Sequence, residues 1–284
     1  MDKKHYGVIG HPIGHTLSPF IHARLMQLSG IDGDYSVFDV PPETLNDDFV
    51  QKLSKLDGFN ATIPHKQAII KLLDELDVTA ELYGSVNTVA FMHDGDNTFS
   101  KGYTTDGIGF VKAVQNAGIS IGRTVTIVGC GGVGRVFANT CAKGGCTLNI
   151  LECEAALESA RKFADSINER FGEGTAKVYL TENFCDESDL LVNATPVGMF
   201  PKIDCCAVSD DVIAKASAVF DAVYNPSETL LVKKAREKGI PAITGMTMLV
   251  YQAAAAQEIW NGSQFRAEDI ETLADDCFKE IAAK

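Results

Sequence analysis

The feature that most constrains the fold is a glycine-rich turn between an apolar strand and a helix. Residues 124–128 (TVTIV) form an apolar run, residues 129–134 (GCGGVG) satisfy the pattern G-x-G-x-x-G, and an amphipathic helical pattern continues to about Lys143. In this context the glycines allow a tight turn and close approach of a pyrophosphate, whereas the plainer alternative is a ligand-free turn. We expect cofactor contacts from Gly129, Gly131, Gly132, Val133, Gly134 and Arg135.

Short apolar strands alternate with helix-sized segments in the rest of the second half. The expected strands are 148–151, 189–193, 218–223 and 241–244, and the residues from Leu249 onward resemble two helices. This alternation indicates right-handed βαβ units on a parallel sheet. In the first half we expect strands at 6–10, 35–40, 58–63 and 86–92, and helices starting at 18, 43 and 66. A domain boundary is expected near residues 106–109.

Composition narrows the function classes. A length of 284 residues suits two domains, and a net charge of −13 without a Lys/Arg cluster argues against nucleic acid and anionic membranes as partners. Eight cysteines without a C-x-x-C pair and six histidines without H-E-x-x-H indicate reduced thiols and no metal site. No stretch of 18 apolar residues is present, so we expect a cytoplasmic protein that acts on a small molecule.

An acidic residue ends the second strand of the nucleotide domain. Glu152 lies 18 residues beyond Gly134, and no Lys or Arg lies between 147 and 160. An acidic side chain at this place hydrogen-bonds ribose hydroxyls and repels a 2′-phosphate, so the sequence favours NAD(H), with NADP(H) as the alternative. The competing interpretation is that Glu152 is a solvated charge at a strand end.

The first half contains polar groups on turns. Thr16 and Ser18 place two hydroxyls before a helix start, where a carboxylate is stabilised, although Ser18 could simply be the N-cap. Lys66 follows an expected strand, Asn87 lies beside another, and Asp106 lies on a turn. Taken singly, each is compatible with ordinary loop chemistry.

Taken together and in this order, these segments resemble the shikimate dehydrogenase family. That family carries S-x-S-P, N-x-T-x-P-x-K, G-x-V-N-T and N-T-D-G in its first half, then G-A-G-G-A, N-A-T-P-x-G-M and D-G-x-x-M-L-V-x-Q-A. The corresponding segments of this chain are 16–19, 60–66, 84–88, 104–107, 129–133, 193–199 and 244–253.

The resemblance implies an α/β fold of two domains separated by a cleft. An N-terminal α/β substrate domain would comprise residues 1–106 plus 250–284, and a Rossmann-like dinucleotide-binding domain residues 107–249. Lys66 and Asp106 would be the catalytic pair. The carboxylate of the substrate would bind Thr16 and Ser18, its hydroxyls Thr62, Asn87 and Gln252 with Tyr224 nearby, and the nicotinamide side would be lined by Thr195, Gly245 and Met248.

Three departures from the family pattern affect the expected chemistry. Thr16 replaces a serine, which admits quinate as a second substrate, and Thr104 replaces an asparagine. The residues Glu152-Cys153-Glu154 replace N-R-T, whose arginine holds a 2′-phosphate, and this supports NAD. Two other functions stay open: a methylenetetrahydrofolate dehydrogenase-like enzyme and a non-catalytic sensor of a nucleotide and a cyclitol acid. A homodimer is also left open.

Overall fold

A computed structural model describes residues 3–14, 16–95 and 97–283. The chain divides into two compact units, Met1–Gly109 with Leu249–Lys284, and Phe110–Met248. Both crossings fall inside helices, α5 (Asp106–Asn116) and α10 (Met246–Asn261). The sequence places these crossings at 106/107 and 249/250.

The first unit is built on a six-stranded mixed sheet in the order β2-β1-β3-β5-β6-β4. Strands β2, β1 and β3 are parallel, whereas β5 pairs antiparallel with both β3 and β6. The strands are β1 (Lys4–Gly10), β2 (Gly33–Asp39), β3 (Gly58–Ala61), β4 (Glu75–Leu76), β5 (Thr88–Asp94) and β6 (Asn97–Tyr103).

Helices pack around this sheet and bury an aromatic and aliphatic core. Tyr6 and Phe59 are fully buried, and Tyr6 stacks on Trp260 of α10 at 4.6 Å between ring centroids. The remaining helices of the unit are α1 (Ser18–Ser29), α2 (Asp47–Leu53), α3 (His65–Ala68), α4 (Val78–Tyr83) and α11 (Ala267–Ala282), with 3-10 turns at Pro42–Thr44 and Ile69–Leu72.

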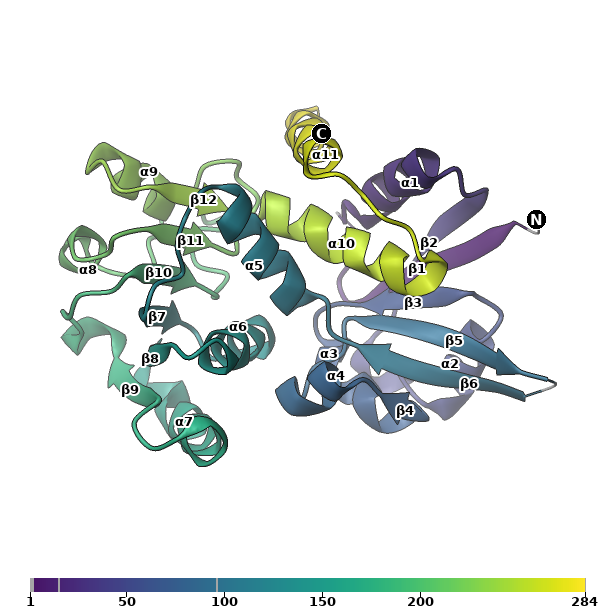
Figure 1. The fold of residues 1–284 in the computed structure, drawn as a ribbon, viewed down its shortest axis with the longest axis horizontal. Helices are drawn as coiled ribbons and strands as arrows, with labels where there is room; N and C mark the ends of the chain where they lie inside the picture. The colour runs from purple at the N-terminus through teal and green to yellow at the C-terminus, as the bar shows by residue number, and fades with distance from the viewer. Residues whose placement is uncertain (1–2, 15, 96, 284) are drawn as a thin grey trace. The chain divides into compact units, whose positions relative to one another are not determined.

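The second unit has a six-stranded, fully parallel sheet. Its order is β12-β11-β10-β7-β8-β9, which is the doubly wound order of dinucleotide-binding folds. In Figure 1 these strands follow one another in this order from top to bottom, with α8 and α9 on the left and α6 on the right. The strands are β7 (Thr124–Val128), β8 (Thr147–Glu152), β9 (Ala176–Leu180), β10 (Leu190–Asn193), β11 (Val219–Asp221) and β12 (Ala242–Thr244).

Three phenylalanines form the centre of the second unit. Phe110, Phe137 and Phe220 are fully buried, and their ring centroids lie 4.5 to 5.8 Å apart. Such offset and edge-to-face contacts add to the area that aromatic rings bury. The helices of this unit are α6 (Gly132–Lys143), α7 (Leu157–Phe171), α8 (Asp210–Ala214) and α9 (Leu230–Glu237), with 3-10 turns at Glu154–Ala156 and Thr181–Asn183.

The predicted α/β class with a Rossmann-like domain is confirmed, and several local predictions are wrong. The helix expected over 66–76 is one short turn of α3 and a 3-10 turn, followed by the short strand β4. Strand β9 was not predicted. Leu17, and not Ser18, is the N-cap of α1, so the Ser18 hydroxyl is not consumed by capping. Among the residues that the structure describes, no helix is both long and apolar enough to cross a membrane.

The phenylalanine cluster predicts a selective loss of stability. Replacing Phe137 by alanine should lower the free energy of unfolding by about 3–5 kcal/mol, because the buried ring leaves a cavity between its neighbours. Phe200 is 63% exposed, and its alanine variant should change stability by less than about 0.5 kcal/mol. Urea denaturation of both variants tests this, and equal losses would contradict it.

Candidate active site

The first unit brings Lys66 and Asp106 together as an ion pair. The Nζ atom of Lys66 donates to Oδ2 of Asp106 at 2.6 Å, and the side chains are 18% and 5% exposed. Lys66 lies in the short helix after β3, and Asp106 is the first residue of α5, where the helix dipole favours a carboxylate. Two groups that are 40 residues apart in the chain are thus directly paired in a poorly hydrated place.

Asn87 holds the carboxylate from its other side. Its Nδ2 donates to Oδ1 of Asp106 and to Oγ1 of Thr105, both at 2.9 Å, and faces Oε1 of Gln252 at 3.3 Å. Its Oδ1 accepts from the backbone N–H of Thr105 at 2.7 Å. Asn87 is 2% exposed, so these bonds fix the orientation of its amide.

The backbone around Lys66 is anchored by its neighbours. Nε2 of His65 lies 2.7 Å from the carbonyl oxygen of Val40, and His65 is 1% exposed. The backbone N–H of Val86 donates to the carbonyl oxygen of Lys66 at 2.8 Å. Because His65 is buried and the carbonyl group of Lys66 accepts a hydrogen bond from Val86, the backbone of the turn that carries Lys66 is held in place.

Thr16 and Ser18 form a joined hydroxyl pair. Oγ1 of Thr16 donates to Oγ of Ser18 and accepts from the backbone N–H of Ser18, each at 3.1 Å. Both residues are partly exposed at the start of α1. The hydroxyls therefore converge beside a helix N-terminus, where a carboxylate is favoured. Thr62 is half-buried at the end of β3.

Two residues that sequence reasoning missed, the buried Asn60 and the half-buried Tyr35, extend this polar network. The hydroxyl of Tyr35 donates to Oδ1 of Asn60 at 2.6 Å, and Nδ2 of Asn60 donates to the backbone oxygen of Asn87 at 3.0 Å. Burial raises the pKa of Tyr35 well above its usual value, and a hydrogen bond with Ser18 opposes this shift. Asn60 begins the N-x-T-x-P-x-K segment and so had a motif signal, whereas Tyr35 had none.

In the second unit, the glycine turn has the backbone conformation and the open space that a phosphate site requires. Gly129 has φ +90°, and a Cβ on Gly134 would lie 2.1 Å from the carbonyl oxygen of Gly129, so the third glycine allows the helix to pack closely. A Cβ on Gly131 or Gly132 would meet no atom within 4 Å, which leaves open space at the N-terminus of α6. These residues fit a dinucleotide pyrophosphate. Val133 is half-buried in the first turn of the helix.

Glu152 and Arg135 flank this turn. The carboxylate of Glu152 accepts from the backbone N–H of Cys130 at 2.5 Å and from that of Cys153 at 3.2 Å. Arg135 donates to the backbone oxygen of Cys130 and to Ser159, and its guanidinium lies 4.7 Å from the ring centroid of Phe163. Through its contacts with Ser159 and Phe163, Arg135 connects α6 to α7.

The other expected cofactor-side residues also lie in the second unit. Thr195 packs on the first glycine, since a Cβ on Gly129 would lie 2.5 Å from Cγ2 of Thr195. A Cβ on Gly245 would lie 2.2 Å from the backbone oxygen of Ala222, so Gly245 permits a close backbone approach. Met248 is buried. Tyr224, which is expected on the substrate side, also lies in this unit, and burial raises its pKa.

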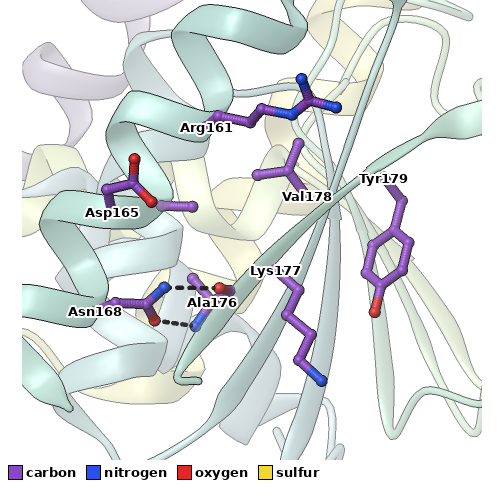
Figure 2. A pocket seen from close by; sticks show the side chains of 8 residues that line it. Arg161, Asp165, Asn168, Ala176, Lys177, Val178 and Tyr179 are labelled. Atoms are coloured by element: carbon purple, nitrogen blue, oxygen red, sulfur yellow. Dashed lines mark hydrogen bonds between the residues drawn. The ribbon is translucent and has the colours of Figure 1, made fainter. Parts of the chain in front are cut away.

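A separate cavity of about 380 Å³ lies along the edge strand β9, against α7 (Figure 2). Asn168 donates to and accepts from the backbone of Ala176 there, which joins helix and strand. Arg161, Asp165, Lys177 and Tyr179 also line it, and none of the expected site residues does. Within the described ranges, no three His, Cys, Asp or Glu side chains are grouped to hold a metal ion.

A partly buried lysine–aspartate pair in one unit and a dinucleotide-type loop in the other are together typical of two-domain dehydrogenases. A family model described as shikimate dehydrogenase substrate binding domain matches residues 8–89. The chain is 38% identical over 267 residues to a "Shikimate dehydrogenase (NADP(+))" of Caldanaerobacter subterraneus subsp. tengcongensis, covering 92% of this chain and 93% of that one.

Solved structures agree with this match. A shikimate 5-dehydrogenase of Listeria monocytogenes in complex with shikimate and NAD has a TM-score of 0.85 and 32% identity, covering 95% of this chain and 96% of that chain. One from Thermus thermophilus in complex with NADP(H) and shikimate has a TM-score of 0.83 and 29% identity, covering 96% and 99%. The chain belongs to the shikimate dehydrogenase family.

The glycine geometry predicts that two alanine substitutions act differently. Gly134→Ala should lower the melting temperature, because its Cβ would collide with backbone at a cost of about 1–3 kcal/mol. Gly131→Ala should leave the melting temperature unchanged but weaken dinucleotide binding on the order of tenfold, since its Cβ occupies the open space. Thermal denaturation and calorimetric titration with NAD measure both effects. Unchanged binding by Gly131→Ala would contradict the assignment of this turn.

Proposed function

We propose that this protein interconverts shikimate and 3-dehydroshikimate with a nicotinamide dinucleotide. The observation that carries the proposal is the bond of 2.6 Å between Lys66 and Asp106, backed by Asn87 in the segments that the family shares. The relatives named above support it, since the Listeria and Thermus proteins are described with shikimate bound.

Lys66 would transfer the proton to and from the reacting oxygen. During ketone reduction negative charge builds on the carbonyl oxygen, and an ammonium group placed there stabilises the charge and donates a proton. In the oxidising direction the neutral amine would accept the proton. Asp106 accepts a hydrogen bond of 2.6 Å from the ammonium group and so keeps it oriented. The dinucleotide, when bound, supplies or accepts the hydride.

The remaining polar groups of the first unit would select the substrate. The hydroxyl pair of Thr16 and Ser18 would bind the carboxylate, and Thr62, Asn87 and Gln252 would bind ring hydroxyls. Asn87 and Gln252 already face each other at 3.3 Å. An analogue that lacks one hydroxyl would leave a buried group unpaired, which makes such a site selective. From the second unit, Tyr224 would also contact the substrate.

NAD(H) is the cofactor that we propose, although the Caldanaerobacter relative is named for NADP(+). The carboxylate of Glu152 is fixed beside the glycine turn by the N–H of Cys130, where it is placed to accept from ribose hydroxyls and to repel a 2′-phosphate. Arg135, the cation nearest to this turn in sequence, is engaged with Cys130 and Ser159. Gly129, Gly131, Gly132, Val133 and Gly134 would surround the pyrophosphate, and Thr195, Gly245 and Met248 the nicotinamide.

Quinate is the second candidate substrate, and Thr16 is the residue that favours it. The threonine keeps the hydroxyl but adds a methyl group where the carboxylate and its ring carbon are expected. A two-by-two assay of shikimate or quinate with NAD or NADP, compared by kcat/KM, separates the substrate question from the cofactor question.

Loss of the lysine should abolish most turnover. Lys66→Ala should reduce kcat by about 10²–10⁴, the range for a lost general acid or base. Lys71→Ala removes an exposed lysine from the following turn and should leave kcat within about twofold. The assay follows reduced nicotinamide with saturating shikimate. Near-normal kcat in Lys66→Ala would overturn the mechanism, and no reaction of the unaltered protein with either substrate would favour a sensor.

Removing the charge of Glu152 should weaken the discrimination against NADP relative to NAD. Glu152→Gln keeps an oxygen for the N–H of Cys130 but removes the charge, so the kcat/KM ratio of NADP to NAD should rise about tenfold, equivalent to about 1.4 kcal/mol. The neighbouring exposed carboxylate provides the control, and Glu154→Gln should change the ratio less than about twofold. If both variants gave the same ratio as the unaltered protein, Glu152 would not discriminate the cofactors.

A further inference from the structure

Asp221 is a buried carboxylate that the mechanism above does not use. It ends β11 and is fully buried. Three neutral groups donate to it: Nδ2 of Asn193 at 2.9 Å, the backbone N–H of Val223 at 3.0 Å and Oγ1 of Thr229 at 2.6 Å. An unpaired carboxylate in such a place is costly, so its retention needs a physical reason.

Its neighbour on the adjacent strand is Asn193. The two residues are paired in the parallel register of β10 and β11, at the carboxyl ends of both strands. Burial raises the pKa of Asp221 to about 6, so above that pH the carboxylate can only accept hydrogen bonds. Nδ2 of Asn193 donates to Asp221 at 2.9 Å and more weakly to the backbone oxygen of Val197 at 3.2 Å, and this orientation directs its Oδ1 the opposite way.

The oxygen of Asn193 holds Thr195. It accepts from the backbone N–H of Thr195 at 3.0 Å and from its hydroxyl at 2.6 Å. The hydroxyl in turn accepts from the backbone N–H of Val197 at 3.1 Å. A flipped amide would present N–H groups to these donors, so the loop after β10 could not keep this conformation.

Thr195 lies where the dinucleotide site is centred. The sheet order reverses between β7 and β10, and ligands of such folds bind where the loops from those two strands diverge. Gly129 follows β7 and Thr195 follows β10, and these two residues are in contact. The position of Thr195 thus sets one wall of the glycine turn.

We propose that Asp221 is a positioning residue for the dinucleotide site and acts through Asn193 on Thr195. The inference rests on the proposed function in that the glycine turn is taken to bind a dinucleotide. It assigns Asp221 no contact with substrate or cofactor.

The test compares variants in calorimetric titrations with NAD, and separately with shikimate, at pH 8. Asp221→Leu should weaken NAD binding at least about tenfold, equivalent to about 1.4 kcal/mol, and leave the shikimate affinity unchanged. Asp221→Asn retains an acceptor for Asn193 and can donate to Thr229, so NAD affinity should stay within about threefold. This rescue would not be expected if the charge itself contacted the cofactor.

Thr229→Val is the matched control. It removes a different donor from the same carboxylate and the N-cap bond of Thr229 to Val232, so it should lower the melting temperature without changing NAD affinity. If Thr229→Val weakened NAD binding as much as Asp221→Leu, the weaker binding would result from a general loss of stability, and the proposal would be overturned. Should Asp221→Leu fail to fold, Asn193→Ala tests the same bond from its other side and should give the same loss.

Hydrogen exchange provides a readout that needs no ligand. In Asp221→Leu the amides of Thr195 and Val197 should exchange faster, whereas those of β7 should not change. Unaltered exchange and NAD affinity in Asp221→Leu would overturn the proposal while leaving the enzymatic function intact. Conversely, NAD binding without turnover of shikimate or quinate would refute the proposed function and leave the role of Asp221 standing.

Discussion

A buried asparagine amide needs acceptors for its N–H groups and donors for its oxygen, and both functional loops are built around this need. Asn87 donates to Asp106 and accepts from the backbone of Thr105. Asn193 does the same with Asp221 and Thr195. In each unit a carboxylate fixes the amide, and the amide fixes the loop that follows a strand. Satisfied polar networks of this kind specify one conformation, because any alternative leaves a buried group unpaired.

The two carboxylates differ in what else they face. The negative charge of Asp106 is compensated by the ammonium group of Lys66, which it orients. Asp221 has only neutral donors, and burial raises its pKa to about 6. In the proposed function, one carboxylate would therefore serve a reacting group directly, whereas the other would act on backbone geometry through a neighbouring amide.

The proposed dinucleotide site would bind its anion through backbone N–H groups rather than through side-chain cations. The net charge of −13 disfavours anions at long range, but screening limits that effect, and the open N-terminus of α6 acts at short range. Glu152 adds a fixed negative charge at the edge of the same turn. The proposed preference for NAD(H) thus follows from a strand-end residue and not from the fold, which the NADP-linked relatives share.

The sequence by itself determined the parallel sheet of the second unit and the glycine turn, because these depend on local patterns of apolar and glycine residues. It also determined the family, because short motifs of polar residues and glycines occur in the family's order along the chain. It did not reveal β9 or the short strand β4, where local preferences are weak and neighbouring strands decide. It also did not reveal that Leu17 is the N-cap of α1. Only the tertiary structure brought Tyr35 to Asn60 and Asn193 to Asp221, pairs that are 25 and 28 residues apart in the chain. Their hydrogen bonds depend on strand register, which no single segment encodes.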